Sequence, residues 1–180
     1  MITEAMGIER SKRRFAAARL ERTARGLLEA STLCGIATVG TGNRAHINTA
    51  YFAWSPDFEL VWSSDPGARH SRNIAASGTV AIAVFDSGQT WGKPDRGIQL
   101  FGSARQADGP VASEAETLYA KRFSAYEPGS LGAYRFYRFR PRTLKLFDER
   151  DLGPGTFVTA RRAAGGRLVW ERTEIYRSAA

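Results

Sequence analysis

The feature that most constrains this chain is a series of short apolar runs that begins near residue 34 and continues almost to the C-terminus. Turn residues such as Gly, Asn, Pro and Asp separate the runs, which lie at residues 34–40, 46–54, 58–64, 79–85, 97–107, 134–140, 144–147, 157–161 and 167–173. Only two internal segments, 66–77 and 110–124, have helical spacing instead. Closely spaced strands with few helices predict a barrel-like antiparallel β fold rather than alternating β-α-β units.

The N-terminal segment has a different pattern. Between residues 9 and 31, apolar side chains recur at roughly helical spacing, and basic side chains cover the remaining surface. The apolar stripe consists of Phe15, Ala18, Leu20, Leu27 and Leu28. We therefore expect a basic amphipathic helix at 9–31, an N-terminal helical extension covering residues 1–32, and one barrel domain covering residues 33–180.

Several classes of protein are disfavoured by what the chain contains. It has one cysteine and two histidines, so neither an intrachain disulfide nor a metal site rich in Cys and His is expected. Cys34 lies in an apolar run and is expected to be a buried structural thiol. No stretch reaches the ~20 apolar residues of a membrane helix, and the charged N-terminus carries no secretory apolar segment. We expect a cytoplasmic protein.

The net charge of +8 favours an anionic partner, either a nucleic acid or a phosphorylated small molecule. Residues 134–142 alternate aromatic side chains with arginine, as grooves for single-stranded nucleic acid do. A β-strand with one aromatic face and one solvated charged face has the same pattern, and we favour this second interpretation.

One short motif resembles a dinucleotide fingerprint in letters only. Residues 40–45 read Gly-Thr-Gly-Asn-Arg-Ala, which matches G-x-G-x-x-A. That motif needs a helix to begin inside it, so that backbone N–H groups face the pyrophosphate. The residues that follow are β-branched and aromatic, and they alternate, so we expect a hairpin turn here.

The segment 61–74 carries the strongest sign of a phosphate site. A strand delivers the hydroxyls of Ser63 and Ser64, the chain turns through Pro-Gly, and a helix opens with Arg69 and His70. Hydrogen-bond donors and positive charge at a helix N-terminus suit a phosphate group. A helix capped by Ser64 or Asp65, with solvated basic residues, explains the same letters, and the residues alone do not separate the two interpretations.

Two other signals are weaker. Trp91, in a Gly-rich and Pro-rich loop at 86–96, could lie over a flat ring or plug the mouth of the barrel. Hydrolytic chemistry is not supported, because G-x-S-x-G is absent and neither histidine has an evident Ser or Cys partner.

The order of these elements resembles the FMN-binding split barrel of pyridoxamine 5'-phosphate oxidase and its relatives. The matching pieces are residues 35–39, 60–64, 69–74, 80–87, 97–104, 137–141 and 144–148, among which Gly102-Ser103-Ala104 has the Gly-x-Ala strand end of the family. The resemblance implies a mainly β (α+β) fold, namely a six-stranded antiparallel split β-barrel with flanking helices and an N-terminal helix. It also implies a homodimer with the cofactor at the subunit interface.

The resemblance also implies a cofactor site. Strand 58–64 and the next helix start would hold the FMN phosphate, the flavin ring would lie along residues 47–52, and the fifth strand would contact the ring. The glutamine that contacts the flavin in the family falls on Gly97, and Gln99 lies two residues on, on the same strand face. The candidate cofactor-binding residues are Ile47, Asn48, Thr49, Trp62, Ser63, Ser64, Arg69, His70, Trp91 and Gln99.

Three functions remain open from the sequence. The first is a flavin-dependent oxidoreductase that uses FMN, or alternatively F420, on a small-molecule substrate, with no acid–base residue that the sequence identifies. Pyridoxal-phosphate synthesis itself is not expected, because the basic residues of the oxidase's second strand and its C-terminal signature are missing. The second is a flavin or haem-type ligand carrier on the same barrel. The third, least favoured, is a nucleic-acid-binding protein, since no recognition motif is present.

Overall fold

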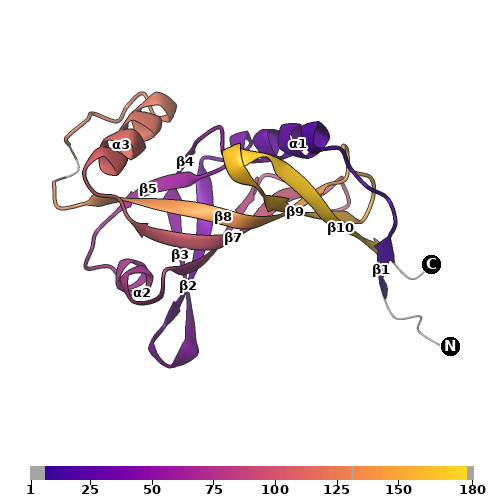
Figure 1. Cartoon of the computed structure of the whole chain (residues 1–180), viewed down its shortest axis with the longest axis horizontal. Helices are drawn as coiled ribbons and strands as arrows, with labels where there is room; N and C mark the ends of the chain where they lie inside the picture. The colour runs from indigo at the N-terminus through magenta and orange to yellow at the C-terminus, as the bar shows by residue number, and fades with distance from the viewer. Residues whose placement is uncertain (1–6, 131, 178–180) are drawn as a thin grey trace.

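The computed structural model describes residues 7–130 and 132–177, which form a curved antiparallel sheet flanked by α-helices (Figure 1). The strands are β1 (Gly7–Ser11), β2 (Leu33–Gly40), β3 (Arg44–Tyr51), β4 (Ala53–Trp54), β5 (Leu60–Ser64), β6 (Thr79–Phe85), β7 (Arg96–Gln106), β8 (Arg135–Asp148), β9 (Thr156–Arg162) and β10 (Leu168–Arg177). The helices are α1 (Ala17–Glu29), α2 (Arg69–Ser77) and α3 (Pro110–Arg122).

The strands pair in the order β1-β10-β9-β8-β7-β6-β2-β3, and β5 joins the sheet through β8. Each of these pairings is antiparallel. The mainly β split barrel with flanking helices is confirmed. The described part has ten strands where six were expected, since β1, the short β4 and the terminal hairpin β9–β10 extend the sheet.

The predicted helix at 9–31 was wrong in its first half. Residues Gly7–Ser11 form β1 and pair with β10, with Arg10 opposite Glu174, and α1 begins only at Ala17. The unpaired edge of β10 offers those backbone groups a ladder of hydrogen bonds, which competes with helix formation. From Leu20 onward the apolar stripe behaves as predicted: Leu20, Leu27 and Leu28 are buried in the same core as the sheet.

One close backbone approach, between β7 and β8, shapes the sheet. The predicted strands 134–140 and 144–147 are one continuous strand, β8, which passes through Pro141 without ending. Proline has no N–H to donate to the ladder, and the register between β7 and β8 shifts between Phe101 and Gly102, opposite this point. A Cβ on Gly102 would lie 2.1 Å from the carbonyl oxygen of Arg140, so only glycine fits there.

The aromatic and basic cluster of residues 134–142 is a strand, as favoured. Phe139 is buried in the core, while Arg138 and Arg140 form ion pairs with the buried carboxylate of Glu59, at 2.5 and 3.2 Å. Arg162 on β9 reaches the same carboxylate at 3.2 Å. A buried carboxylate requires such partners. The ion pairs therefore connect Glu59, directly before β5, to β8 and β9.

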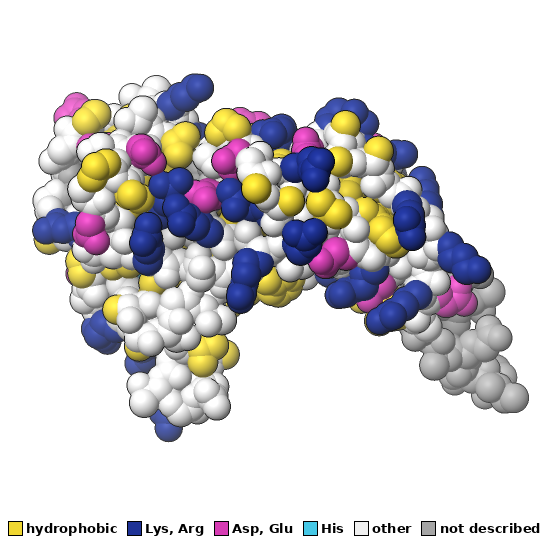
Figure 2. Space-filling view, in the orientation of Figure 1, with side chains coloured by type: hydrophobic (Ala, Val, Ile, Leu, Met, Phe, Trp, Pro, Cys, Tyr) yellow, Lys and Arg dark blue, Asp and Glu magenta, His cyan; other side chains and the backbone are white. Residues whose placement is uncertain are grey.

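Basic side chains are dispersed over the molecule. On the face seen in Figure 2, Lys and Arg are scattered between acidic and apolar side chains, and they form no single stripe. Nothing on this face favours a nucleic-acid groove. None of the helices in the described ranges has the length and apolar character needed to cross a membrane.

Cys34 is a buried structural thiol, as expected. Its side chain is 2% exposed within the main core. Burial raises the pKa of the thiol to about 12, so it stays protonated and unreactive at neutral pH.

Candidate functional site

The turn between β5 and α2 positions the candidate site. Asp65 accepts a hydrogen bond from the N–H of Gly67 at 2.7 Å, and α2 then begins at Arg69, three residues later than predicted. The residue before the helix is Ala68, and no side chain of the described residues caps the helix start. The capping role predicted for Ser64 or Asp65 was therefore wrong. The first amides of α2, which lack helical partners, remain available to an anion.

His70 faces back toward β5 and is almost fully buried. Its Nε2 and the Oγ of Ser64 lie 2.6 Å apart, in hydrogen-bonding contact. Its ring is parallel to that of His46, with 6.4 Å between the ring centroids. Burial, and secondarily the charge of His46, lower the pKa of His70 below its usual 6.5. At neutral pH His70 is therefore neutral and offers a hydrogen bond rather than the positive charge expected from the sequence.

Beside His70 lies a cavity of about 400 Å³, here called the hydroxyl cavity. Its lining includes Asn48, Thr49, Ser63, Ser64, His70 and Tyr119. Strand β3 supplies the first two of these residues, β5 the two serines, and α3 the tyrosine. Ser63 forms a hydrogen bond with Tyr119, whose pKa is raised chiefly by burial, so its phenol stays protonated. The cavity thus offers neutral donors and acceptors to a polar ligand, together with the exposed acidic residue Asp65 at the turn before α2.

A second hollow, the arginine groove, runs along the other side of the helix start. It measures about 660 Å³ and lies between α2 and the tip of the β2–β3 hairpin, which projects from the body in Figure 1. Its polar lining includes Asn43, Arg44, His46, Arg69, Arg72 and Asn73. The motif of residues 40–45 forms the hairpin turn, as predicted, with Gly42 and Asn43 at positive φ.

Charge in the arginine groove is not balanced by nearby acids. Neither Arg44 nor Arg69 has an ion-pair or hydrogen-bonding partner for its side chain among residues 7–130 and 132–177, and Arg72 donates only to the carbonyl of Gly67. The structure therefore divides the pair that sequence reasoning joined. Arg69 lines the arginine groove, and His70 lines the hydroxyl cavity.

Several predicted residues lie elsewhere. Trp62 is fully buried, stacks on Tyr137 and lines neither hollow. Ile47 is 72% exposed and lines neither hollow. Trp91 is 98% exposed, so it does not plug the barrel. Gln99 is exposed on β7, opposite Ala83 and Lys145, and also lines neither hollow.

The glycine at the family's glutamine position has a structural cause. A Cβ on Gly97 would lie 2.2 Å from the Cζ of Phe147, on the neighbouring strand β8. The ring of Phe147 fills the space that a glutamine side chain would need. A contact from this position to a flavin would have to come from a backbone atom.

Sequence reasoning missed Tyr119 and Arg44 as site residues. Tyr119 lies on the apolar stripe of α3, and a phenol on a core-facing stripe signals a buried hydroxyl that needs a partner. Arg44 gave no such signal, because its proximity to Arg69 depends on how the hairpin packs against α2.

The match to known proteins agrees with this geometry. A family model for pyridoxamine 5'-phosphate oxidase matches residues 20–148, and the chain belongs to this family. No curated protein is similar enough in sequence to count as a match.

Solved structures share the fold at low sequence identity. HutZ, a haem storage protein from Vibrio cholerae, is 18% identical with a TM-score of 0.62, over 72% of this chain and 95% of HutZ. A haem-binding protein from Mycobacterium smegmatis is 14% identical with a TM-score of 0.60, over 93% of this chain and 90% of that protein. An F420 reductase is 23% identical with a TM-score of 0.52, over 67% of this chain and 94% of the reductase.

Proposed function

We propose that this protein is a cytoplasmic flavin-dependent oxidoreductase that binds FMN, or alternatively F420, and acts on a small-molecule redox substrate. The observation that carries the proposal is the uncapped N-terminus of α2 with Arg69, directly beside a cavity lined by hydroxyls and a neutral imidazole. Family membership supports the cofactor class, and one neighbour is named as an F420 reductase.

The residues present fit a flavin phosphate. The free amides at the start of α2 and the guanidinium of Arg69 would hold the phosphate oxygens, since charge-assisted hydrogen bonds are the strong ones. Ser64 would be oriented by its contact with His70. Thr49 and Ser63 would offer hydroxyls to the polar edge of the ligand.

When bound, a flavin supplies hydride or electron transfer, and the protein supplies position and electrostatics. Tyr119 is the described residue of the hydroxyl cavity best placed to assist, because its neutral phenol can donate a hydrogen bond to a bound substrate or ring. The proposed role of Tyr119 is to donate a hydrogen bond, and it does not include proton transfer.

The arginine groove bears on the choice between FMN and F420. Both cofactors present a phosphate and a flat ring, and F420 carries further carboxylates beyond its phosphate. Arg44 and Arg72 lie on the groove that continues from Arg69, where such carboxylates would meet positive charge. FMN has no group that would need them.

We also propose a homodimer across the outer face, meaning the sheet surface that carries Leu33, Val39, Ile47, Tyr51, Phe85 and Phe101. These side chains are 37% or more exposed, and strand register places them on one side of β3-β2-β6-β7. An apolar patch of this kind usually marks an interface. A second copy is the favoured occupant because Tyr51 belongs both to this face and to the lining of the hydroxyl cavity, so a partner on this face would adjoin the cavity. Light scattering should give a dimer mass, and Ile47→Asp should give a monomer.

The direct test is to purify the protein and record its visible spectrum and the mass of any ligand released from it. Added FMN and F420 are then titrated into ligand-free protein. Micromolar binding of either, followed by reduction of the bound flavin with NAD(P)H or a partner system and its reoxidation, supports the enzyme. A colourless protein that binds neither cofactor contradicts the proposal.

A haem-type carrier is a second candidate, favoured by the two neighbours named as haem-binding or haem storage proteins. Imidazole is a frequent axial ligand of haem iron. The Nε2 of His70 is engaged with Ser64, whereas the ring of His46 has no hydrogen-bond partner in the described part of the chain. A haem absorption band that is lost in His46→Ala would favour the carrier. Stoichiometric flavin binding without transfer to any acceptor would favour a flavin carrier.

A further inference from the structure

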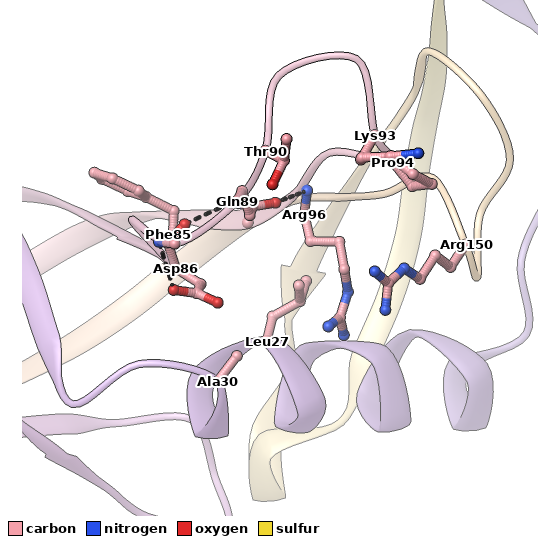
Figure 3. Close-up of a pocket in the computed structure, with 12 residues that line it drawn as sticks. Leu27, Ala30, Phe85, Asp86, Gln89, Thr90, Lys93, Pro94, Arg96 and Arg150 are labelled. Carbon is pink, nitrogen blue, oxygen red and sulfur yellow. Dashed lines mark hydrogen bonds between the residues drawn. The ribbon is translucent and has the colours of Figure 1, made fainter.

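A third hollow, here called the loop cavity, shares no lining residue with the arginine groove or the hydroxyl cavity. It measures about 250 Å³ and is enclosed by the end of α1, the β6–β7 loop and the turn after β8 (Figure 3). Its walls combine the apolar side chains of Leu27, Phe85 and Pro94 with the cationic side chains of Lys93, Arg96 and Arg150. This volume is just below the range of roughly 300–1,000 Å³ for drug-sized ligands, so it suits a small molecule.

Arg96 is held in place by a buried carboxylate. Its Nε donates to the Oδ2 of Asp148 at 2.8 Å, and Asp148 is 3% exposed. The other carboxylate oxygen of Asp148 accepts the backbone N–H groups of Arg150 and Asp151, at 3.1 and 3.3 Å. A guanidinium fixed through Nε keeps its two terminal nitrogens for another acceptor.

The guanidinium groups of Arg96 and Arg150 both point into the space above α1, beside Leu27 (Figure 3). Neither Lys93 nor Arg150 has an ion-pair partner among the described residues, although both line the cavity. Two cations that face the same space repel each other, and an anion between them would convert that repulsion into attraction.

Neighbouring carboxylates are used elsewhere. Glu149 accepts the backbone N–H groups of Asp95 and Gly155, and Asp151 binds Thr23 and Arg19 on α1. Asp86 lines the cavity, and one of its oxygens accepts the N–H of Gly88. The neighbouring carboxylates therefore do not neutralise the cations of the cavity, and positive charge remains in excess there.

The C-terminal carbonyls of α1 do not explain the convergence either. Carbonyl groups at a helix C-terminus attract cations, but the carbonyls of Leu28, in the last turn of α1, and of Ser31, just after the helix, accept hydrogen bonds from Arg122, on α3, at 3.0 and 2.8 Å. Arg150 donates to none of the carbonyls in residues 7–130 and 132–177.

The wall of the cavity is ordered in advance. The side chain of Gln89 donates to the carbonyl of Asp86 at 2.9 Å and accepts the N–H of Arg96 at 2.6 Å. At the other end of the loop, Glu149 donates its backbone N–H to the carbonyl of Asp95 at 3.0 Å. A ligand that enters this cavity would not have to order the loop, which lowers the entropic cost of binding.

We propose that the loop cavity binds a small organic carboxylate whose carboxylate group pairs with Arg96 and Arg150 and whose apolar body packs against Leu27. The planar fork of a guanidinium matches the two oxygens of a carboxylate, and the apolar wall excludes a purely inorganic anion as the best ligand. This site is separate from the flavin site and does not depend on flavin binding.

The test uses benzoate as the probe and benzamide as its neutral match in shape. The full chain, with Leu methyl groups labelled, is titrated with each compound and followed by NMR, with and without added flavin. Benzoate should shift the Leu27 methyl signals with a saturable, millimolar or tighter dissociation constant, and benzamide should bind at least roughly tenfold more weakly, about the value of one charge-assisted hydrogen bond. Buried Leu60, far from the cavity, is the internal reference.

Substitutions of arginine residues test where the carboxylate group of benzoate binds. Arg150→Gln should weaken benzoate binding roughly tenfold, Arg150→Lys should weaken it less, and Arg142→Gln, an exposed arginine on β8, should leave it unchanged. The proposal is overturned if benzoate and benzamide bind equally, if Arg150→Gln binds benzoate as well as the original chain, or if inorganic phosphate shifts Leu27 while benzoate does not. Each of these readouts is independent of whether flavin binds.

Discussion

The arginine groove and the loop cavity are two cationic hollows built in opposite ways. Four of the groove's cationic or polar residues, Arg69, Arg72, Asn73 and Ser77, come from one short helix, and the rest come from a single hairpin. The loop cavity combines Leu27, Arg96 and Arg150, from three distant parts of the chain. A site built locally leaves a recognisable string of letters, whereas a site built from distant segments does not.

The two hollows also differ in what holds their charges. Arg69 has no acidic partner among the described residues, so its orientation is free to follow a ligand. Arg96 is bound to a buried carboxylate, which also organises the turn that carries Arg150. The groove is therefore expected to contribute to ligand binding and little to stability, and the cavity is expected to contribute to both.

The largest expected effect tests the groove. Arg69→Ala should lower flavin affinity roughly tenfold to a hundredfold, because it removes a charge-assisted hydrogen bond of about 1.5–3 kcal/mol. Dissociation constants for FMN and F420 are measured by titration, with circular dichroism as the check of folding. Arg150→Ala is the matched control and should leave both constants unchanged. A folded Arg69→Ala protein with unchanged affinity would place the phosphate elsewhere.

A stability measurement tests the loop cavity. Asp148→Asn should lower the free energy of unfolding by about 1–2 kcal/mol, because Arg96 and two backbone N–H groups lose a charged acceptor and the pair is partly open to solvent. Urea unfolding provides the comparison. Asp65→Asn, in the exposed turn before α2, should cost less. Equal losses of unfolding free energy in the two variants would show that Asp148 stabilises the fold no more than Asp65 does.

A smaller effect separates the two cofactors. Arg44→Ala should weaken F420 by up to about fivefold, the range of an exposed ion pair, and should leave FMN unchanged. Its dissociation constants are best measured at low and at high salt, because screening should remove the difference. Equal weakening of FMN would assign Arg44 to the shared phosphate instead of to the tail of F420.

The smallest expected effect concerns His70. Its folded pKa is lowered by burial from the usual 6.5, so the unfolded chain binds the proton more tightly than the folded chain. The stability contributed by neutral His70 is present above pH 6.5 and is lost as pH falls through the folded pKa. Unfolding free energies of the original chain should therefore fall more between about pH 7.5 and about pH 5.5 than those of His70→Gln, by less than about 1.4 kcal/mol per pH unit. Identical pH dependence would mean that His70 titrates normally.

Sequence patterns were sufficient for most elements and for part of the site. Alternation and turn residues located β2, β6 and β7, and the hairpin at residues 40–45, within a few positions. Asn48, Thr49, Ser63, Ser64 and His70 were predicted together and do line one cavity. The proximity of Ser63, Ser64 and His70 follows from local order, because β5 leads through one turn into α2, whereas Asn48 and Thr49 come from β3.

What the sequence determined by itself was most of the strands and helices and the polar turn at the start of α2, since these are encoded by neighbours along the chain. The tertiary structure decided that Gly7–Ser11 pairs as a strand, that Phe147 excludes a side chain at residue 97, and that Arg69 and His70 face different hollows. It also decided that Arg96 and Arg150 converge. Local patterns record the periodicity of burial, whereas a cavity depends on which distant side chains packing brings together, and no short stretch of sequence contains that information.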